Sequence, residues 1–314
     1  MDRKHRAEEI STSTRACEMS PITPRYNETM PVKLIAMDID GTLLDSESRL
    51  SEENIRAIQE AAARGIEIVA VTGRRFASAR AIFSPLECDL HLIVSNGALI
   101  KSRTGETHQR CLLPTETARR VLEAAVDYRA HACVVFDRPR ENQLFFEKVD
   151  WEGPFHGPYL RRHREQVTEV VPLTACLDGE DPIQVMFLGE CTVMRRAMEL
   201  LEALPSATEH TLALTEYSNR NLSMLDVLRR GVTKGSALAE WARRRGIARE
   251  EVMAIGDNWN DREMLEYAGL PIVMANAIPE LKSLGWTVTL SNDENGVAEA
   301  IWSYALNDTS PRQR

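Results

Sequence analysis

Residues 37–48 read MDIDGTLLDSES, and their first residue is also the last of the apolar run VKLIAM at 32–37. A short apolar run of this kind predicts a strand that is buried on both faces, as in a parallel sheet. Asp38 and Asp40 come directly after it, and side chains two residues apart on an extended chain point the same way. Two like charges there repel each other, so the pair is expected to belong to a site that offsets this cost.

Strand-like and helix-like segments alternate on either side of this stretch. Apolar runs predict strands at 66–71 and 91–94, and later at 252–255 and 271–274. Between and after them, helices are predicted at 52–64 (preceded by Ser51 as a possible cap), 75–83, 232–245, 260–267 and 278–284. Strands that alternate with helices indicate βαβ units, so the predicted fold class is α/β, with a doubly wound, Rossmann-like parallel sheet as its core.

The middle of the chain breaks this alternation. Helices are predicted at 115–129 and 193–203, and strands at 132–136, 143–147, 182–188 and 222–227. We therefore expect an inserted α+β cap domain at 101–219, between the two halves of a core domain at 30–100 and 220–314. Residues 1–29 are polar and rich in Ser, Thr and Pro, and they are expected to form a disordered tail.

The composition is that of a soluble globular protein, with 43% hydrophobic and 27% charged residues among 314. The net charge of −9 comes without a dominant basic stripe, which argues against nucleic acid as the main partner. No run of about 18 apolar residues occurs, so neither a membrane span nor a membrane partner is predicted. Six scattered cysteines without a C-x-x-C pair favour a reducing, cytoplasmic location.

Polar motifs fall where ligands bind in an open parallel sheet, outside the carboxyl ends of the strands. Besides Asp38 and Asp40, they are Thr72-Gly73-Arg74 after the second strand, Lys234 in GVTKGSAL at a helix start, and GDNWND at 256–261. The last motif adds Asp257 and Asp261 to the acids at this edge. Gathered in one crevice, the four carboxylates would repel one another strongly unless a cation lay among them.

A hard divalent cation with oxygen ligands removes this repulsion, and Mg²⁺ is the natural choice where phosphate is the substrate. Thr72, the Gly73 amide, Lys234 and Asn260 are then hydrogen-bond donors suited to a phosphoryl group. Acids, a metal and a phosphate cradle together predict a phosphoryl-transfer site for a small-molecule phosphate ester. In such a site a carboxylate can act as the nucleophile and form an aspartyl-phosphate.

These motifs resemble the four signatures of the haloacid dehalogenase-like (HAD) superfamily: D-x-D-G-T, a Thr after the second strand, a downstream Lys, and G-D-x-x-x-D. The forms TGR, SNGA at 95–98, GVTKGSAL and GDNWNDREML are similar to the Cof-type (IIB) subfamily of sugar-phosphate phosphatases. The resemblance runs from about Pro31 to near Trp302, and the position of the insert matches a C2-type cap.

The resemblance implies roles for the candidate residues. Asp38 resembles the nucleophile and a Mg²⁺ ligand, and Asp40 resembles the general acid/base whose backbone carbonyl also binds the metal. Asp257 resembles the remaining metal ligand, and Asp261 would orient metal-bound water or Lys234. The phosphate contacts would be Thr72, Gly73, Lys234 and Asn260, with Arg74 and Asn96 in support. Trp259 and the basic run Arg161–Arg164 could each be ordinary surface residues or contacts to the substrate.

The motifs are compatible with three functions. The first is a Mg²⁺-dependent phosphatase that acts on a small phosphorylated metabolite, with a sugar phosphate as the expected substrate. The second is a phosphomutase of the phosphomannomutase type, which would need a bisphosphate activator. The third is a non-enzymatic phosphate-binding regulator, which the paired acids and the large insert disfavour.

Overall fold

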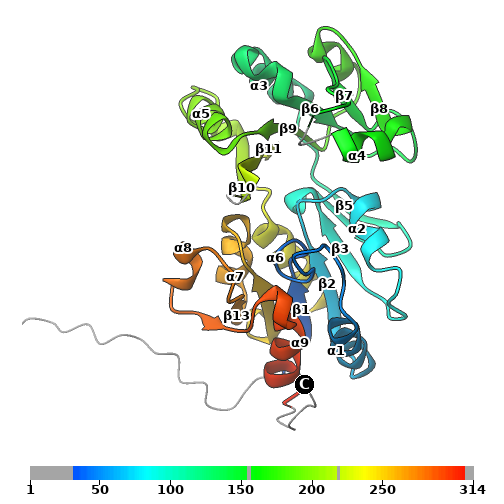
Figure 1. Ribbon diagram of the computed structural model, residues 1–314, viewed down its shortest axis with the longest axis vertical. Coiled ribbons are helices and arrows are strands. Elements are labelled where there is room, and N and C mark those ends of the chain that lie inside the picture. The colour runs from blue at the N-terminus through cyan, green and yellow to red at the C-terminus, as the bar shows by residue number, and fades with distance from the viewer. Residues whose placement is uncertain (1–30, 154–156, 218–219, 308–314) are drawn as a thin grey trace, which may run out of the picture. The chain divides into compact units, whose positions relative to one another are not determined.

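The computed structural model describes residues 31–153, 157–217 and 220–307, so the tail predicted at 1–29 lies outside the described residues (Figure 1). Two β-sheets organise this part of the chain, and they are called here the core sheet and the cap sheet. None of the helices among these residues is long and apolar enough to cross a membrane. The five described cysteines are free, and the cytoplasmic location stays a prediction.

The core sheet has eight strands, and β1 lies near its middle. In spatial order they are β14 (Thr287–Val288), β13 (Leu270–Val273), β12 (Val252–Gly256), β1 (Leu34–Met37), β2 (Glu67–Val71), β3 (His91–Val94), β4 (Leu99–Ser102) and β5 (Thr107–Arg110). The strands from β14 to β3 pair in parallel, and all four residues of β1 are buried, which confirms the predicted parallel core. The antiparallel β3–β4–β5 edge was not predicted.

Six helices of the described chain accompany the core sheet, and the start and end of α6 follow recognisable sequence signals. They are α1 (Glu52–Ala63), α2 (Phe76–Ile82), α6 (Lys234–Arg245), α7 (Arg262–Tyr267), α8 (Pro279–Lys282) and α9 (Gly296–Ala300). Thr233 and Ser236 cap each other's backbone amides at the start of α6. The helix ends at Gly246, whose φ of 68° lies in the left-handed region that favours glycine. The first residue of α6 is therefore Lys234, one of the predicted site residues.

The cap sheet has six strands and its own hydrophobic core. Its strands are, in spatial order, β10 (His210–Tyr217), β11 (Leu222–Arg229), β9 (Gln184–Gly189), β6 (Ala132–Val135), β7 (Leu144–Phe146) and β8 (Val167–Glu169). The helices of this region are α3 (Thr115–Ala124), α4 (Gly157–Arg162) and α5 (Cys191–Glu202). Apolar side chains of α3 and α5 pack with one face of the sheet, where Phe136, Phe187 and Leu225 are fully buried.

The strand pairing corrects the predicted boundaries of the insert. Residue 101 falls inside β4, which still pairs in the core sheet, as β5 does. Residue 220 precedes β11, which pairs in the cap sheet with β9 and β10. The chain therefore changes sheet after β5 and after β11, later than predicted at both ends. The first change is late because the hairpin β4–β5 extends the core sheet, and the second because β11 pairs with β9 and β10. The division into separate core and cap domains stays a prediction.

Candidate active site

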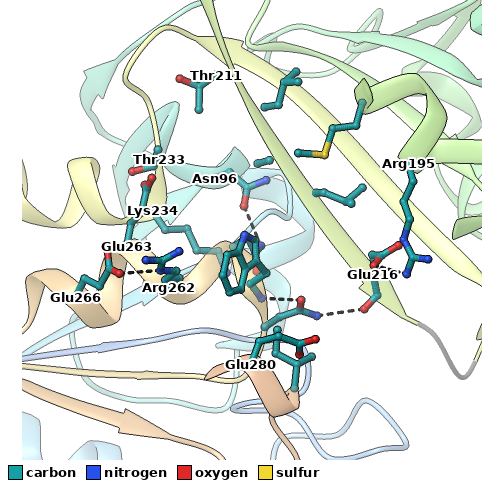
Figure 2. A pocket seen from close by; sticks show the side chains of 18 of the residues that line it. Asn96, Arg195, Thr211, Glu216, Thr233, Lys234, Arg262, Glu263, Glu266 and Glu280 are labelled. Carbon is teal, nitrogen blue, oxygen red and sulfur yellow. Dashed lines mark hydrogen bonds and ion pairs between the residues drawn. The ribbon is translucent and has the colours of Figure 1, made fainter. Parts of the chain in front are cut away.

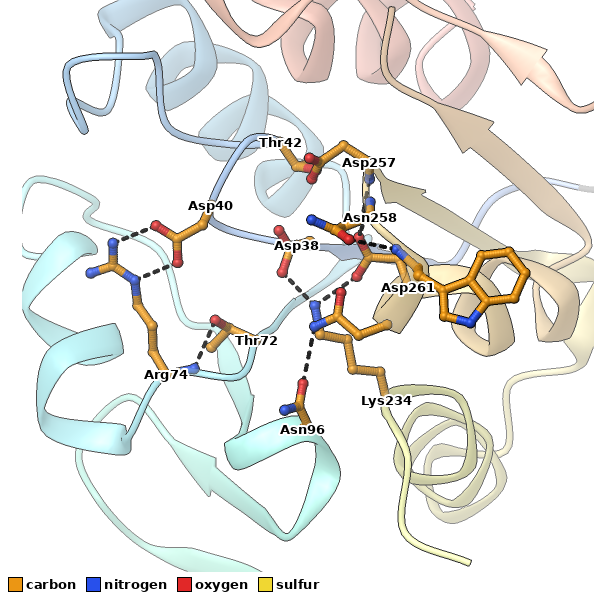
Figure 3. Close-up of polar contacts among 12 residues, drawn as sticks. Asp38, Asp40, Thr42, Thr72, Arg74, Asn96, Lys234, Asp257, Asn258 and Asp261 are labelled. Atoms are coloured by element: carbon orange, nitrogen blue, oxygen red, sulfur yellow. Dashed lines mark hydrogen bonds and ion pairs between the residues drawn. The ribbon is translucent and has the colours of Figure 1, made fainter. Parts of the chain in front are cut away.

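Three neighbouring strands bring the predicted motifs to one edge of the core sheet. β1 lies between β12 and β2, and all three run in parallel. The loops that follow them therefore leave the sheet side by side, carrying Asp38, Thr72 and Asp257. Figure 3 shows these side chains around the amine of Lys234, which approaches from the start of α6.

Lys234 is the cation at the centre of the cluster. Its Nζ donates to Oδ1 of Asp38 at 2.5 Å and to Oδ1 of Asp261 at 2.6 Å, and the residue is only 2% exposed. Burial lowers the pKa of Lys234, but the charges of Asp261 and Asp38 outweigh burial, and the net shift is upward. The lysine is therefore held as a cation between two buried acids.

The three buried acids near Lys234 carry more negative charge than this one cation can neutralise. Carboxylate oxygens of Asp38, Asp257 and Asp261 lie within 4.8 Å of one another, and all three residues are buried. Burial raises the pKa of Asp38 well above its usual range, and burial together with the Asp261 charge raises the pKa of Asp257 to about 7. Such a set of oxygen donors, short of positive charge, fits a divalent cation.

Asp261 differs from the other two acids because both its oxygens already have partners. Oδ1 accepts from Lys234, and Oδ2 accepts from the backbone amides of Asp257 and Asn258, at 3.0 Å each. Gly256 makes this approach possible, since a Cβ there would lie 2.6 Å from the Cβ of Asp261. Of the two roles predicted for Asp261, this geometry favours the one in which it orients Lys234.

Gly41 and Thr42 explain why the opening motif reads D-G-T. The φ of Gly41 is 85°, and a Cβ on it would lie 2.4 Å from Oδ2 of Asp257. Thr42 donates through Oγ1 to Oδ1 of Asp257 at 2.8 Å. The loop after β1 therefore packs tightly against Asp257 and orients its carboxylate.

The carboxylate of Asp40 does not join the acid cluster, although the sequence predicted all four carboxylates close together. Both its oxygens accept from Arg74, with Nε to Oδ2 at 2.7 Å and Nη2 to Oδ1 at 2.5 Å. Figure 3 shows Asp40 and Arg74 pointing toward each other, away from Lys234. The chain is no longer extended after Asp38, so the two side chains diverge; both still line one cavity.

The predicted phosphate contacts lie beside this cluster. Thr72 lines the cavity with Asp38, and its Oγ1 accepts from the backbone amide of Arg74 at 3.1 Å. Asn96 packs against Gly73, where a Cβ would lie 3.2 Å from its Nδ2. Asn260 donates through Nδ2 to Oδ1 of Asn96 at 3.2 Å. The structure thus brings together Thr72, Gly73, Lys234, Asn96 and Asn260.

Asp226 and Gln184 were missed by the sequence reasoning. Asp226 in β11 is 3% exposed, and its carboxylate accepts from Nδ2 of Asn96 at 2.8 Å and Nε2 of Gln184 at 2.6 Å. Burial raises the pKa of Asp226 to about 7. This carboxylate fixes the amide of Asn96 so that its oxygen faces Asn260. The available signal was an acid in the apolar stretch LSMLDVL, shortly before the Lys234 motif.

Two cavities adjoin the cluster. One, of about 400 Å³, lies between the core loops that carry Asp38 and Thr72 and side chains of the cap sheet. The other, of about 800 Å³, reaches Lys234, Asn96 and Asn260 from another side (Figure 2). Trp259 lines this second cavity, is 46% exposed, and has the guanidinium of Arg262 over its ring at 4.9 Å. It therefore does not line the cavity of Asp38 and Asp40.

Arg161 and Arg164 of the basic run at 161–164 line neither cavity. Arg161 donates to the backbone oxygen of Trp151 and pairs with Glu152, and the guanidinium of Arg164 lies 4.8 Å from the Trp151 ring centroid. These contacts indicate a structural role for Arg161 and Arg164 at the surface of the cap region.

Comparison with known sequences agrees with this geometry. Residues 35–301 match the family model described as haloacid dehalogenase-like hydrolase. A 5-amino-6-(5-phospho-D-ribitylamino)uracil phosphatase of Bacillus subtilis (strain 168) is 32% identical over 280 residues, which cover 89% of this chain and 98% of the relative. An HMP-PP phosphatase of Serratia proteamaculans (strain 568) is 32% identical over 254 residues, which cover 80% and 87%.

Solved structures of haloacid dehalogenase-like proteins have a similar fold. A haloacid dehalogenase-like hydrolase from B. subtilis aligns with a TM-score of 0.70 at 26% identity, over 86% of this chain and 99% of that one. A sugar phosphatase of HAD subclass IIB aligns with a TM-score of 0.69 at 23% identity, over 88% and 100%. The second similarity shows the fold alone.

Proposed function

Because this chain is a phosphatase of the Cof-type branch of the haloacid dehalogenase-like hydrolases, we propose that it hydrolyses the phosphate ester of a small metabolite. The reaction would use Mg²⁺ and pass through an aspartyl-phosphate on Asp38. The observation that carries this proposal is the buried cluster in which Lys234 joins Asp38 to Asp261 beside Asp257. That the substrate is a sugar phosphate remains a prediction from the sequence. Phosphate release from a panel of phosphorylated metabolites tests the proposal, and no release from any of them would contradict it.

Asp38 and Asp257 would hold the metal through their carboxylates. The backbone carbonyl of Asp40 would be the third protein ligand, as the family resemblance implies. Among the described residues, Lys234 is the one ion-pair partner of Asp38, and Asp257 has none. When bound, Mg²⁺ would neutralise the acid cluster and the charge of the phosphoryl group. Asp261 would keep its ion pair with Lys234 and its hydrogen bonds from the backbone amides of Asp257 and Asn258.

Asp38 and Asp40 would divide the chemistry between them. An oxygen of Asp38 attacks phosphorus, the bond from phosphorus to the ester oxygen breaks, and Asp40 gives a proton to the departing alcohol. Asp40 then takes a proton from the water that attacks the aspartyl-phosphate, which releases Asp38 and inorganic phosphate. In the structure Asp40 is bound by Arg74 through both oxygens, so proton transfer requires this ion pair to open.

The donors around Asp38 would hold the phosphoryl oxygens. Thr72, the Gly73 amide and Asn260 lie on one side, and Lys234 contacts the nucleophile itself. Because Asp226 fixes Asn96 and Asn96 accepts from Asn260, the amide of Asn260 is oriented before substrate binds. Donors oriented in advance stabilise developing charge without the cost of reorganisation.

Replacing Lys234 with Ala should lower kcat/KM by about a hundredfold, the scale of losing one preoriented charged contact. The substitution also removes the cation shared by two buried acids, so the variant should unfold at a lower temperature. Steady-state kinetics and circular dichroism at the assay temperature separate the two effects.

The matched control is Lys101→Ala. Lys101 is 7% exposed and forms a 2.6 Å ion pair with Asp137, but it lines neither cavity. This control should lose stability and keep kcat/KM. Near-normal kinetics in a folded Lys234→Ala protein would exclude Lys234 from the phosphate site.

Replacing Asp40 with Asn should slow the hydrolysis of esters with poor leaving groups most, by roughly a thousandfold, because the departing alcohol no longer receives a proton. An aryl phosphate with an activated leaving group needs little protonation, so it should still phosphorylate Asp38 and then stall. Single-turnover bursts with both ester types check this prediction. Equal slowing of phosphorylation for both types would remove the acid/base role from Asp40.

A further inference from the structure

The 400 Å³ cavity has two walls of different chemistry. The core wall carries the groups that act on phosphate, among them Asp38, Asp40, Thr72 and Arg74. The opposite wall comes from the cap sheet, and most of its side chains are apolar. We define six of them as the apolar cap face: Val135, Leu144, Phe146, Met186, Leu188 and Met224.

Strand register shows that these six residues form a continuous surface. Met186 and Leu188 lie two apart on β9, and Leu144 and Phe146 lie two apart on β7, so each pair shares a face. Cross-strand pairing then sets Leu188 beside Met224 and Val135 beside Leu144. The alternate residues Val185, Phe187 and Phe145 belong to the hydrophobic core beneath α3 and α5.

The face of the cap sheet that lines the cavity is therefore mostly apolar, with Gln184 and Asp226 as polar members. A sheet with one solvated face ordinarily alternates apolar and polar residues. An apolar surface in a binding cavity is favourable where an apolar part of the ligand covers it. Met186 and Met224 are only partly buried, which leaves them available for such contact.

The cap region also brings polar groups to this surface: Gln184 pairs beside Val135, Asp226 pairs beside Met186, and Arg220 lines the cavity. Gln184 is 2% exposed, and its amide already donates to Asp226. Thr215 and Tyr217 come from β10, the edge strand of the cap sheet. A polyhydroxylated sugar would bring several hydroxyls against the apolar cap face, where they would lose hydrogen bonds to water without replacement.

We infer that the phosphate ester taken by this cavity carries a compact, largely apolar group, with an aromatic ring as the best fit, rather than the sugar predicted from the sequence. The inference rests on the proposed phosphatase function and concerns only the group that leaves with the ester oxygen. Phe146 is mostly buried but lines the cavity, and the partly exposed thioethers of Met186 and Met224 can adapt to an aromatic surface.

The test compares benzyl phosphate with glucose 6-phosphate, because each carries its phosphate on a methylene attached to a six-membered ring. The expected kcat/KM is at least about tenfold higher for benzyl phosphate, which corresponds to roughly 1.4 kcal/mol. Met224→Gln, which keeps the side-chain length and adds an amide, should shrink this ratio by about tenfold. Leu200→Gln, on an exposed position of α5, is the control and should leave the ratio unchanged.

The outcomes separate this inference from the proposed function. Equal or better hydrolysis of glucose 6-phosphate, with a ratio that Met224→Gln does not change, would overturn the inference and leave the phosphatase intact. If neither ester is hydrolysed, the panel of phosphorylated metabolites decides the proposed function, and the methyl NMR signals of Met186 and Met224 decide the inference. Benzyl phosphate should shift both signals through its ring current; shifts of neither signal, or equal shifts with glucose 6-phosphate, would overturn it.

Discussion

Asp38→Asn should abolish turnover of every phosphate ester, lowering kcat by at least about 10⁴-fold, because the amide cannot attack phosphorus. The fold should survive this change. Burial already disfavours the charged form of Asp38, so a neutral residue of the same shape removes an unfavourable term, while its oxygen can still accept from Lys234. The unfolding temperature is therefore expected to stay equal or to rise.

Asp45→Asn is the matched control for this prediction. Asp45 lies in the same loop after β1, but its carboxylate accepts from the exposed Arg49 and lines neither cavity. The control should hydrolyse phosphate esters at the normal rate. If the Asp38→Asn protein is folded and turns over substrate at a rate near that of the control, Asp38 is not the nucleophile.

Removing divalent cations should lower activity by about a thousandfold, since a bound cation in such a site contributes several kcal/mol to transition-state stabilisation. The structural reason is the excess of buried negative charge, which raises the pKa of both Asp38 and Asp257. Chelation with EDTA followed by readdition of Mg²⁺ should restore the rate. Mg²⁺ should also raise the unfolding temperature, because a ligand that binds only the folded state stabilises it.

Excess Ca²⁺ should inhibit rather than activate. Ca²⁺ takes more ligands at longer distances than Mg²⁺, so it would engage both oxygens of Asp38 and hinder attack on phosphorus. Rates measured at fixed Mg²⁺ with increasing Ca²⁺ check this point. Full activity after exhaustive chelation would contradict the metal assignment. If the Asp257→Asn protein is activated by the same Mg²⁺ concentration as the unchanged protein, Asp257 is not a metal ligand.

The sequence predicted the core of this protein well because its signals are local. Each motif follows an apolar strand directly, so Asp38, Thr72 and Asp257 could be placed at one sheet edge without knowledge of distant contacts. Lys234 could be placed at a helix start because Thr233 and Ser236 form a recognisable cap. These short-range patterns also carried the resemblance to the family.

Features that depend on distant contacts were not predicted. The direction of the Asp40 side chain is set by Arg74, which lies 34 residues away. Asp226 gains its place in the site from Asn96, 130 residues away, and the sequence around it indicates only a buried strand. The hairpin β4–β5 was missed because the strand THQR is polar at every position. β10 was also missed, although Leu212 and Leu214 alternate there with smaller residues.

On the proposed mechanism, Asp38 carries the phosphoryl group between the two half-reactions. The most direct measurement mixes Asp40→Asn protein with an activated aryl phosphate, quenches in acid within one turnover, and locates phosphate by mass spectrometry of peptides. We expect one phosphoryl group, of the acid-stable and base-labile acyl type, on the peptide that contains Asp38. A burst of aryl alcohol with no phosphorylated peptide, or with phosphate on another residue, would contradict it.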